Sequence, residues 1–556
     1  MKSYPTLRRV LAAGITAVLL GGVLAVVTWA NKSNKDEENA KEKAPADRGW
    51  HLFGGGITRN MVNTWERNVP TEWSVEVGSE KNIKWVADLG SKAYGGPIVA
   101  DGKIFIGTNN ENPKDPKIKG DKGVLMCFNE KDGKFLWQAI HDKLEAGRVN
   151  DWPREGICST PIVEGKRIYY CSNRSEVICA TTDGLADGKN EGVQDETYKG
   201  PQKADIVWRL DLIKELNNFP HNLTTCSPLI VGDLLFIVTA NGVDEGHINI
   251  PQPKAPSFIA LDKNTGKIIW EDNSPSRSLA EAQAAGKPVV VKDLVNQGKL
   301  LMHGQWSNPV YAEANGHPQV LFPGGDGWIY AFEPKTGKLI WKFECNPKNS
   351  KYELGGKGTR SDFLGTPVIY DNKCYIGVGQ DPEHDEGIGH FWSIDITKKP
   401  ANKELDLSPQ KDNFDPKAEV NKNSGLVWHY GGAAPKGSDR NYLFGRTMST
   451  AAIKDDLVYI AELAGYLHCL DAKTGKQYWE HNMEAATWSS AYWVDNKMYM
   501  GNDDGKVLIF AHGKEKKLLG EIDMGGKVRA MPAVANGVLY ITTENKLYAI
   551  ADKGGK

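Results

Sequence analysis

The chain has 556 residues, with 68 lysines and arginines against 70 aspartates and glutamates, so its formal net charge is only −2. A nearly neutral chain argues against a nucleic-acid-binding protein, which would need a basic surface. The 59 glycines and 17 tryptophans suit many tight turns and packed strands, and they do not suit a helical protein.

The first 30 residues have the composition of a membrane anchor. Two arginines precede an uncharged apolar run over residues 10–30, about the length that spans a bilayer as a helix. The basic flank predicts a cytoplasmic N-terminus and a body outside the inner membrane, in the periplasm or another extracytoplasmic space. The other interpretation is a cleaved signal peptide and a secreted chain, although Thr28-Trp29-Ala30 is a poor cleavage site.

A charged stretch of low hydrophobicity follows over residues 31–48. It cannot bury enough apolar surface to fold, so we predict a flexible tether. The predicted organisation is therefore an anchor or signal over residues 1–30, a linker over 31–48 and one repeat domain over 49–556.

A short pattern recurs along the predicted repeat domain. A strand ends in a turn of the Thr-Gly-Lys type, and a second strand carrying tryptophan follows. The copies with this turn run over residues 124–137, 257–270, 324–341 and 466–479. The turn glycines, Gly133, Gly266, Gly337 and Gly475, lie where a hairpin needs a positive φ.

Eight segments match the second strand of this unit, from KIFIGT at residue 103 to VLYITT at residue 538. The eighth copy ends without a fourth strand, and NIKWVAD around Trp85 has the missing sequence. We therefore predict an all-β, eight-bladed β-propeller in which the N-terminal strand closes the last blade and removes exposed sheet edges.

The Ala-x-Asp-x-x-Thr-Gly-Lys-x-x-x-Trp pattern resembles the PQQ-like (quinoprotein-type) propeller repeat, and the resemblance runs from Trp73 to the C-terminus. That family includes quinoprotein alcohol dehydrogenases and the non-enzymatic propeller of the outer-membrane assembly machinery. The resemblance implies the fold and leaves the chemistry open. One implied function is an extracytoplasmic binding or scaffold module. The alternative is a PQQ-dependent dehydrogenase of alcohols or sugars, with PQQ and Ca²⁺ as cofactors.

The cysteines bear on this choice. The dehydrogenases that the chain resembles use adjacent cysteines as a disulfide platform, and no two of the eight cysteines here are adjacent. Cys127, Cys179 and Cys469 occupy a third-strand position that other copies fill with alanine or serine. We therefore predict small, buried, unpaired thiols at these positions, and we favour the binding module.

The unusual loops of the repeat fall mostly between the fourth strand of one blade and the first strand of the next (D–A), or between the second and third strands (B–C). These connections share one face of a propeller, and long loops on rigid scaffolds tend to carry function. We predict that this face is the working face. Two long C–D connections, over residues 183–205 and 397–424, are expected to be exposed loops that contact partners.

Arginine, tryptophan and aspartate side chains in the D–A loops form the candidate cofactor site at the mouth of the funnel. Arginine forks suit a carboxylate or phosphate, and aromatic rings suit a flat ligand. An aspartate in this position suits a general base. The other interpretation is that the arginines pair with nearby acids and the rings pack between blades. The candidate residues are Arg154, Trp306, Arg360, Asp362, Arg446 and Trp488.

Two similar B–C loops combine carboxylates with imidazoles. Carboxylates suit Ca²⁺, and carboxylates with imidazoles suit a transition metal. The spacing does not match an EF-hand, and a hydrogen-bonded loop brace is the other interpretation. The candidate ligands are Asp244, His247, Asp381, Glu383, His384 and His390. The expected partners are envelope proteins or a small anionic ligand, bound by a monomeric propeller attached to the membrane.

Overall fold

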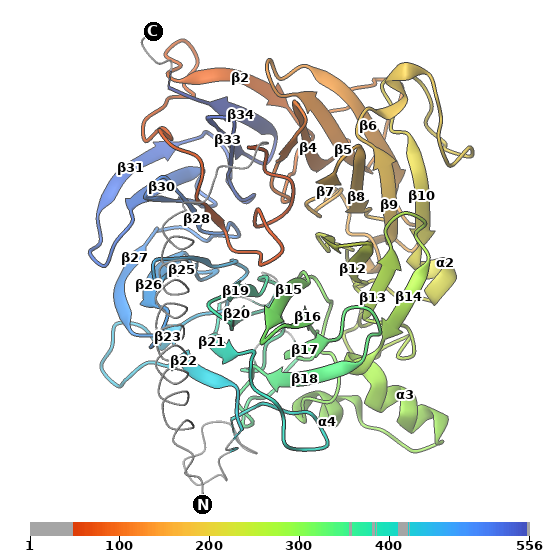
Figure 1. The fold of residues 1–556 in the computed structure, drawn as a ribbon, viewed down its shortest axis with the longest axis vertical. Helices are drawn as coiled ribbons and strands as arrows, with labels where there is room; N and C mark the ends of the chain where they lie inside the picture. The colour runs from red at the N-terminus through yellow and green to blue at the C-terminus, as the bar shows by residue number, and fades with distance from the viewer. Residues whose placement is uncertain are drawn as a thin grey trace, which may run out of the picture. The chain divides into compact units, whose positions relative to one another are not determined.

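The computed structural model describes residues 48–354, 358–380, 384, 386–409, 421 and 423–552. Residues Gly49–Lys556 form one compact unit. In its described part, eight β-sheets are arranged in a ring around a central axis (Figure 1). The prediction of an eight-bladed, all-β propeller is confirmed.

Each of the first four blades is an antiparallel sheet whose strands run outward from the axis in chain order. Blade 1 contains β3 (Ile98–Ala100), β4 (Lys103–Asn109), β5 (Lys122–Asn129) and β6 (Phe135–Asp142). Blade 2 contains β7 (Ile162–Glu164), β8 (Arg167–Cys171), β9 (Glu176–Thr181) and β10 (Ile206–Asp211). Blade 3 contains β11 (Leu229–Val231), β12 (Leu234–Val238), β13 (Phe258–Asp262) and β14 (Ile268–Asp272). Blade 4 contains β15 (Val310–Ala314), β16 (His317–Pro323), β17 (Trp328–Phe332) and β18 (Leu339–Glu344).

The next three blades keep this order, and two of them carry an extra strand. Blade 5 contains β19 (Val368–Tyr370), β20 (Lys373–Val378), β21 (His390–Asp395), β22 (Leu426–Ala433) and β23 (Tyr442–Phe444). Blade 6 contains β24 (Ala452–Lys454), β25 (Leu457–Ala461), β26 (Tyr466–Asp471) and β27 (Gln477–Asn482). Blade 7 contains β28 (Tyr492–Val494), β29 (Lys497–Gly501), β30 (Lys506–Ala511) and β31 (Leu518–Asp523), with β1 (Val62–Asn63) added in parallel to β28.

Blade 8 joins the two ends of the propeller. It contains β32 (Ala533–Ala535), β33 (Val538–Thr542) and β34 (Lys546–Ile550), and β2 (Ile83–Asp88) from the start of the chain forms its outer strand. Val86 pairs with Tyr548 in this antiparallel sheet. The predicted closure by the strand around Trp85 is therefore confirmed, and the last blade has no open outer edge at β34.

Tryptophans of the outer strands link neighbouring blades. The indole N–H of Trp270 in blade 3 donates to the carbonyl of Pro334 in the turn of blade 4, at 2.8 Å. A Cβ built on Gly337 in that turn would lie 2.6 Å from the Trp270 ring. The turn glycine is thus needed for its φ of 67° and also for the space under the indole. The same arrangement recurs where Trp85 covers Gly133, Trp208 covers Gly266 and Trp428 covers Gly475.

The two long C–D connections pack against the preceding blade. Lys203 forms a parallel bridge with Gln138 of β6, and Asp406 forms one with Lys342 of β18. In their described parts these insertions cover outer strands of their own protein, while most of their residues are exposed or half-buried, in line with the expected exposed loops. Contact of these loops with partners remains a prediction. The short helices lie in connections: η1 (Gly147–Val149), η2 (Gly184–Asp187), α2 (Leu212–Leu216), η3 (Ser274–Ser276), α3 (Arg277–Ala284) and α4 (Val291–Asn296).

The segment over residues 50–63 lies across the central axis, which the sequence did not predict. It hydrogen-bonds to residues in or beside the innermost strand of every blade. The blade residues involved are Val99, Val163, Pro228, Tyr311, Ile369, Ile453, Trp493 and Val534. This segment therefore closes one side of the channel.

Arg59 holds the middle of this segment. Its side chain is fully buried, and it donates to the carbonyls of Phe53, Ser227, Pro228 and Pro309 at 2.9–3.0 Å. Burial lowers the pKa of its guanidinium to about 10. The arginine therefore joins the N-terminal segment to blades 3 and 4 from inside the ring.

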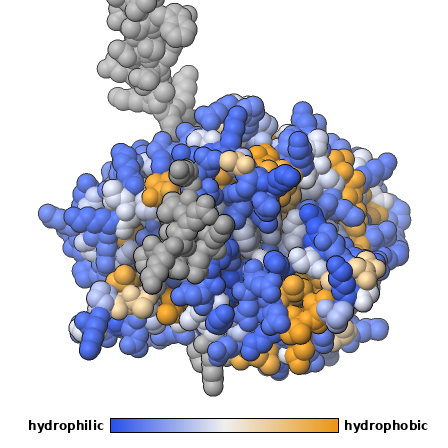
Figure 2. Space-filling model, turned by 90° about the horizontal axis from the view of Figure 1, so that it is seen from below, coloured by the Kyte–Doolittle hydropathy of each residue, from blue (hydrophilic) through white to orange (hydrophobic). Residues whose placement is uncertain are grey.

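All eight cysteines are free thiols, as predicted for Cys127, Cys179 and Cys469. In the part of the chain that the structure describes, no helix is both long and apolar enough to cross a membrane, and the predicted anchor lies outside that part. The side of the molecule seen in Figure 2 is mostly hydrophilic, with hydrophobic residues in small separate groups.

Candidate functional site

The D–A connections of all eight blades line a central cavity of about 370 Å³. This volume lies within the range of roughly 300–1,000 Å³ typical of small-molecule sites. Phe53 from the axial N-terminal segment also lines it. The apolar part of the wall is made by Tyr94, Trp152, Leu223, Trp306, Leu364, Met448, Trp488 and Met531.

The polar part of the wall is a ring of hydrogen bonds between neighbouring blades. In most links, a backbone N–H at the start of one innermost strand donates to a side-chain oxygen of the next blade; between blades 4 and 5 the donor is the amide side chain of Asn308. The linked residues are Gly96, Thr160, Ser227, Asn308, Thr366, Thr450 and Ser490, with separations of 2.6–3.1 Å. These links join seven consecutive blades and fix the hydroxyl and amide groups that face the cavity.

Arg529 supplies a positive charge to the cavity wall. Its guanidinium carbon lies 3.9 Å from the centre of the Trp488 ring, within cation–π distance. Its Nε and Nη2 donate to the two carboxylate oxygens of Asp503 at 2.9 and 2.5 Å, and its Nη1 donates to the Tyr94 hydroxyl at 3.3 Å. The Tyr94 and Trp488 rings stack with centres 5.5 Å apart. The cation is thus rigidly held and already neutralised by a carboxylate.

Trp152, Glu155 and Cys158 also line the cavity. Arg148 lies 4.4 Å from the centre of the Trp152 ring, and Glu155 forms an ion pair with Lys92. Burial, followed by the charge of Glu155, raises the pKa of the Cys158 thiol well above its usual value. Cys158 is therefore a neutral thiol at physiological pH and not an activated nucleophile.

The predicted cofactor residues separate into two groups. Trp306 and Trp488 line the cavity. Arg154, Arg360, Asp362 and Arg446 do not line it. Arg154 is exposed and pairs with Glu111. The other three are buried.

The buried arginines hold loops and blades together. Arg360 pairs with Glu344 at 2.9 Å and also donates to the carbonyl of Asp326. Arg446 donates to the carbonyls of His384 and Gly358, the latter at 2.8 Å. These contacts match the structural interpretation of the arginines. The arginine that lines the cavity is Arg529, which lies in a similar D–A loop.

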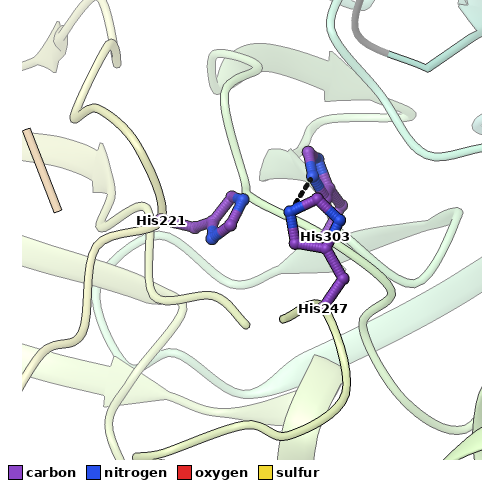
Figure 3. Close-up of side chains that lie close together, drawn as sticks. All are labelled: His221, His247 and His303. Atoms are coloured by element: carbon purple, nitrogen blue, oxygen red, sulfur yellow. Dashed lines mark hydrogen bonds between the residues drawn. The ribbon is translucent and has the colours of Figure 1, made fainter. Parts of the chain in front are cut away.

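The predicted metal ligands also separate. His247 and His384 lie in a cluster with two histidines that the sequence analysis did not select, His221 and His303. The ring centre of His384 is 5.8 Å from that of His247 and 5.0 Å from that of His303. His221, His247 and His303 have ligand atoms within 4.8 Å of one another (Figure 3).

The other predicted metal ligands lie elsewhere. His390 hydrogen-bonds to His429 at 2.8 Å. Asp244 accepts hydrogen bonds from the backbone N–H groups of Ile248 and Asn249. Partial burial raises the pKa of the Asp244 carboxyl, but these hydrogen bonds outweigh it and hold the pKa below its usual value. The ionised carboxylate braces the loop that presents His247. Asp381 and Glu383 lie outside the described residues.

The positions of His221 and His303 in the repeat could have indicated that they lie near His247 and His384. His221 and His303 lie in D–A loops, as His247 and His384 lie in B–C loops, and all these loops emerge on the same face. His221 and His303 do not fit the acid-and-histidine pattern, because their own loops carry no carboxylate beside the imidazole.

The fold and the site define an eight-bladed β-propeller with an axial cavity that is closed on one side by its own N-terminal segment. The family model described as outer membrane protein assembly factor BamB matches residues 201–381 and 417–516, just over half of the chain. The chain therefore belongs to this family of PQQ-like propellers.

Curated relatives match at low identity. The chain is 22% identical to quinohemoprotein alcohol dehydrogenase ADH IIB of Pseudomonas putida over 360 residues, which is 60% of this chain and 42% of the relative. It is 26% identical to tetrathionate hydrolase of Acidithiobacillus ferrooxidans over 172 residues, which is 31% of this chain and 26% of the relative. The chain thus spans less than half of the length of these relatives.

Among solved structures, quinohemoprotein alcohol dehydrogenase of Comamonas testosteroni aligns with a TM-score of 0.58 at 14% identity, over 94% of this chain and 82% of that one. A europium-containing methanol dehydrogenase aligns with a TM-score of 0.56 at 13% identity, over 91% and 98%. At this level of identity the likeness concerns the fold.

The residues of the cavity do not fit the cofactors that the resemblance implies. PQQ carries three carboxylates, whereas Arg529 is the one cation among the residues that line the described cavity, and it is already paired with Asp503. Glu155 is the one carboxylate of that wall, where Ca²⁺ would require six to eight oxygen ligands. Cys158, whose thiol lines the cavity, has no adjacent cysteine in the sequence.

Proposed function

We propose that this protein is an extracytoplasmic binding module whose axial cavity takes a flat organic ligand of low net charge. The cavity that all eight blades line supports this proposal. Its volume suits a small molecule, and the rings of Trp152, Trp306 and Trp488 offer flat apolar surfaces.

The charges of the wall favour a ligand without several carboxylates. Arg529 is balanced by Asp503, and Glu155 is balanced by Lys92. A multiply charged anion would lose its hydration without gaining enough opposite charge in return. This refines the expectation of a small anionic ligand, which rested on Arg154, Arg360 and Arg446.

The competing function is a PQQ-dependent dehydrogenase, which the names of the relatives suggest. The two functions differ in the cofactor that the purified chain should bind. We propose to titrate the full chain with menadione, a neutral two-ring quinone, and separately with PQQ in the presence of CaCl₂, following tryptophan fluorescence and absorbance. A dye-linked alcohol oxidation assay accompanies the PQQ titration.

We expect saturable binding of menadione and weak or absent binding of PQQ. Replacing Trp152 by alanine should weaken menadione binding about tenfold, since stacked rings contribute roughly 1 kcal/mol beyond their buried area. Tyr478→Ala, on the outer strand β27, should leave the affinity unchanged. Stoichiometric PQQ uptake with alcohol oxidation would overturn the proposal in favour of the dehydrogenase.

The location in the envelope rests on residues 10–30 and is part of the proposal. We expect the full chain to stay in carbonate-washed membranes, with its body accessible from the outer side of the inner membrane. Recovery of a shortened, unattached chain would instead support a cleaved signal. Binding of envelope proteins and a monomeric state remain predictions for the same preparations.

A further inference from the structure

Three histidines from blade 3 and the two connections that flank it meet on the face that carries the axial cavity, and His384 of blade 5 lies beside them. His221 lies between α2 and β11, His247 between β12 and β13, and His303 between α4 and β15. The ring centres of these three are 4.5–4.8 Å apart. Figure 3 shows the three imidazoles grouped, with a hydrogen bond between His247 and His303.

The hydrogen bonds of His221 fix which nitrogen can bind a metal. Its Nδ1 lies 2.9 Å from the carbonyl oxygen of Val243. A carbonyl only accepts, so Nδ1 carries the proton and the lone pair is on Nε2. A backbone carbonyl bound to the distal nitrogen is the usual second-shell partner of a metal-ligating histidine.

The spacing of the other two nitrogens suits a tetrahedral ion. Nε2 of His303 lies 3.3 Å from Nε2 of His247. Two imidazole nitrogens bound to one tetrahedral zinc at about 2.0–2.1 Å lie about 3.3–3.4 Å apart. The widest separation in the group is 4.8 Å, so a movement of about 1.5 Å brings all three nitrogens to the distances of a tetrahedral site.

The backbone around the cluster is arranged to bring these rings together. His247 has a φ of 55°, an uncommon conformation for a residue with a Cβ, and the loop is held there by Asp244. A Cβ on Gly242 would lie 2.6 Å from Cβ of His221, so this glycine permits the close approach. His221 and His303 are both buried, so the cluster lies below the surface of this face.

We propose that His221, His247 and His303 form a binding site for a late transition-metal ion such as Zn²⁺, with one coordination position left for water or a ligand. Three imidazoles suit zinc, copper or nickel, whereas calcium requires oxygen ligands. His384 packs beside the site. The inference does not depend on what binds in the axial cavity.

The site adjoins that cavity through one side chain. Trp306 lines the cavity, its indole N–H donates to the carbonyl of His221 at 3.2 Å, and its ring centre lies 4.9 Å from that of His303. Metal binding is therefore expected to change the surroundings of the Trp306 indole. This change can be followed without any assay of activity.

The test is isothermal titration of the metal-free full chain with ZnCl₂ and with CaCl₂, together with the visible spectrum of the Co²⁺ complex. We expect one zinc per chain, a tetrahedral cobalt spectrum and no calcium binding. His247→Asn keeps a residue that tolerates positive φ and removes the imidazole. It should lower the zinc affinity roughly 100-fold or more, and His303→Gln should do the same.

The matched control is His317→Asn, which removes an exposed histidine at the start of β16. It should bind zinc like the unchanged protein. Circular dichroism and thermal unfolding of each variant separate loss of the site from loss of the fold. The proposal would be overturned if a folded His247→Asn variant bound zinc as well as the unchanged chain, or if the unchanged chain bound no stoichiometric zinc. Either result would mean that the imidazole rings only pack against one another.

Discussion

The guanidinium of Arg529 lies 3.9 Å from the centre of the Trp488 ring while both oxygens of Asp503 accept hydrogen bonds from it. The Asp503 carboxylate fixes the plane of the Arg529 guanidinium against the Trp488 indole. It also neutralises the positive charge that the guanidinium would otherwise present to the cavity. The preference of the cavity for ligands of low charge therefore depends on a residue, Asp503, that does not itself line the cavity.

Replacing Asp503 by asparagine should change this preference. The guanidinium would keep its position over Trp488 but would no longer be neutralised, so the wall would gain a positive charge. We expect a carboxylated aromatic probe such as 2-naphthoate to bind several-fold more tightly, with a stronger salt dependence, while menadione binding changes little. Asp504→Asn, at the exposed neighbouring position, is the control. A similar gain in both variants would show that the ion pair does not set the charge preference.

The turn glycine of blade 4 allows a test of how tryptophans join the blades. Gly337 and Gly316 have φ values of 67° and 72° in the same blade, but only Gly337 lies under a tryptophan, Trp270. Gly316→Ala should cost about 1 kcal/mol of unfolding free energy, because alanine disfavours positive φ. Gly337→Ala should cost this amount plus about 1–3 kcal/mol for displacing the indole. Chemical denaturation measures both, and equal losses would mean that the indole contact adds nothing.

The periodicity of the sequence predicts the blades and their closure, because each blade repeats the same buried pattern. Trp85 pairs opposite Ala549 as the unit requires. The repeat says nothing about residues 50–63, which match no strand of the unit and gain their structure only from contacts with all eight blades. The axial position of Arg59 therefore could not be inferred.

The site was less predictable than the fold for a related reason. The loops could be assigned to one face, and two of the side chains chosen on that basis, Trp306 and Trp488, line the cavity; their role in binding a cofactor stays a prediction. Whether a loop arginine faces the cavity or turns into the wall depends on its neighbours in space. Arg360 turns toward Glu344, whereas Arg529 remains at the cavity. The meeting of His221 with His303 likewise depends on the curvature of the ring.

The His390–His429 pair in blade 5 should make stability depend on pH. Burial, and then the neighbouring imidazole, lowers the pKa of His390 to about 3, and burial lowers that of His429 to about 4. The unfolded chain binds these protons near pH 6.5, so the folded state loses stability as the pH falls from about 6.5 toward these values. Each histidine should contribute up to about 2 kcal/mol of loss by pH 5.

The measurement is the unfolding free energy at pH 7.5 and at pH 5 in the same variant. His429→Gln can still hydrogen-bond to His390 but does not titrate, so its stability should fall less between these pH values. His317→Gln, at an exposed position, should follow the unchanged protein. If His429→Gln shows the full pH dependence, the pair does not carry it.

Arg59 should be among the costliest single residues to replace. Methionine at this position keeps much of the side-chain volume but leaves the buried carbonyls of Phe53, Ser227, Pro228 and Pro309 without their donor. Each unsatisfied buried group costs about 1–3 kcal/mol, and partial relaxation should leave a total of about 3–5 kcal/mol. Arg67→Met, just beyond this segment, is the control, because Arg67 is exposed and donates to the carbonyl of the adjacent Glu66. Chemical denaturation gives the two losses, and limited proteolysis reports whether residues 50–63 leave the axis before the blades unfold.

Since the segment closes one side of the cavity through Phe53, its early release should also weaken menadione binding. Comparable stability of the two variants would mean that blade packing alone holds the ring and that the axial arginine is dispensable.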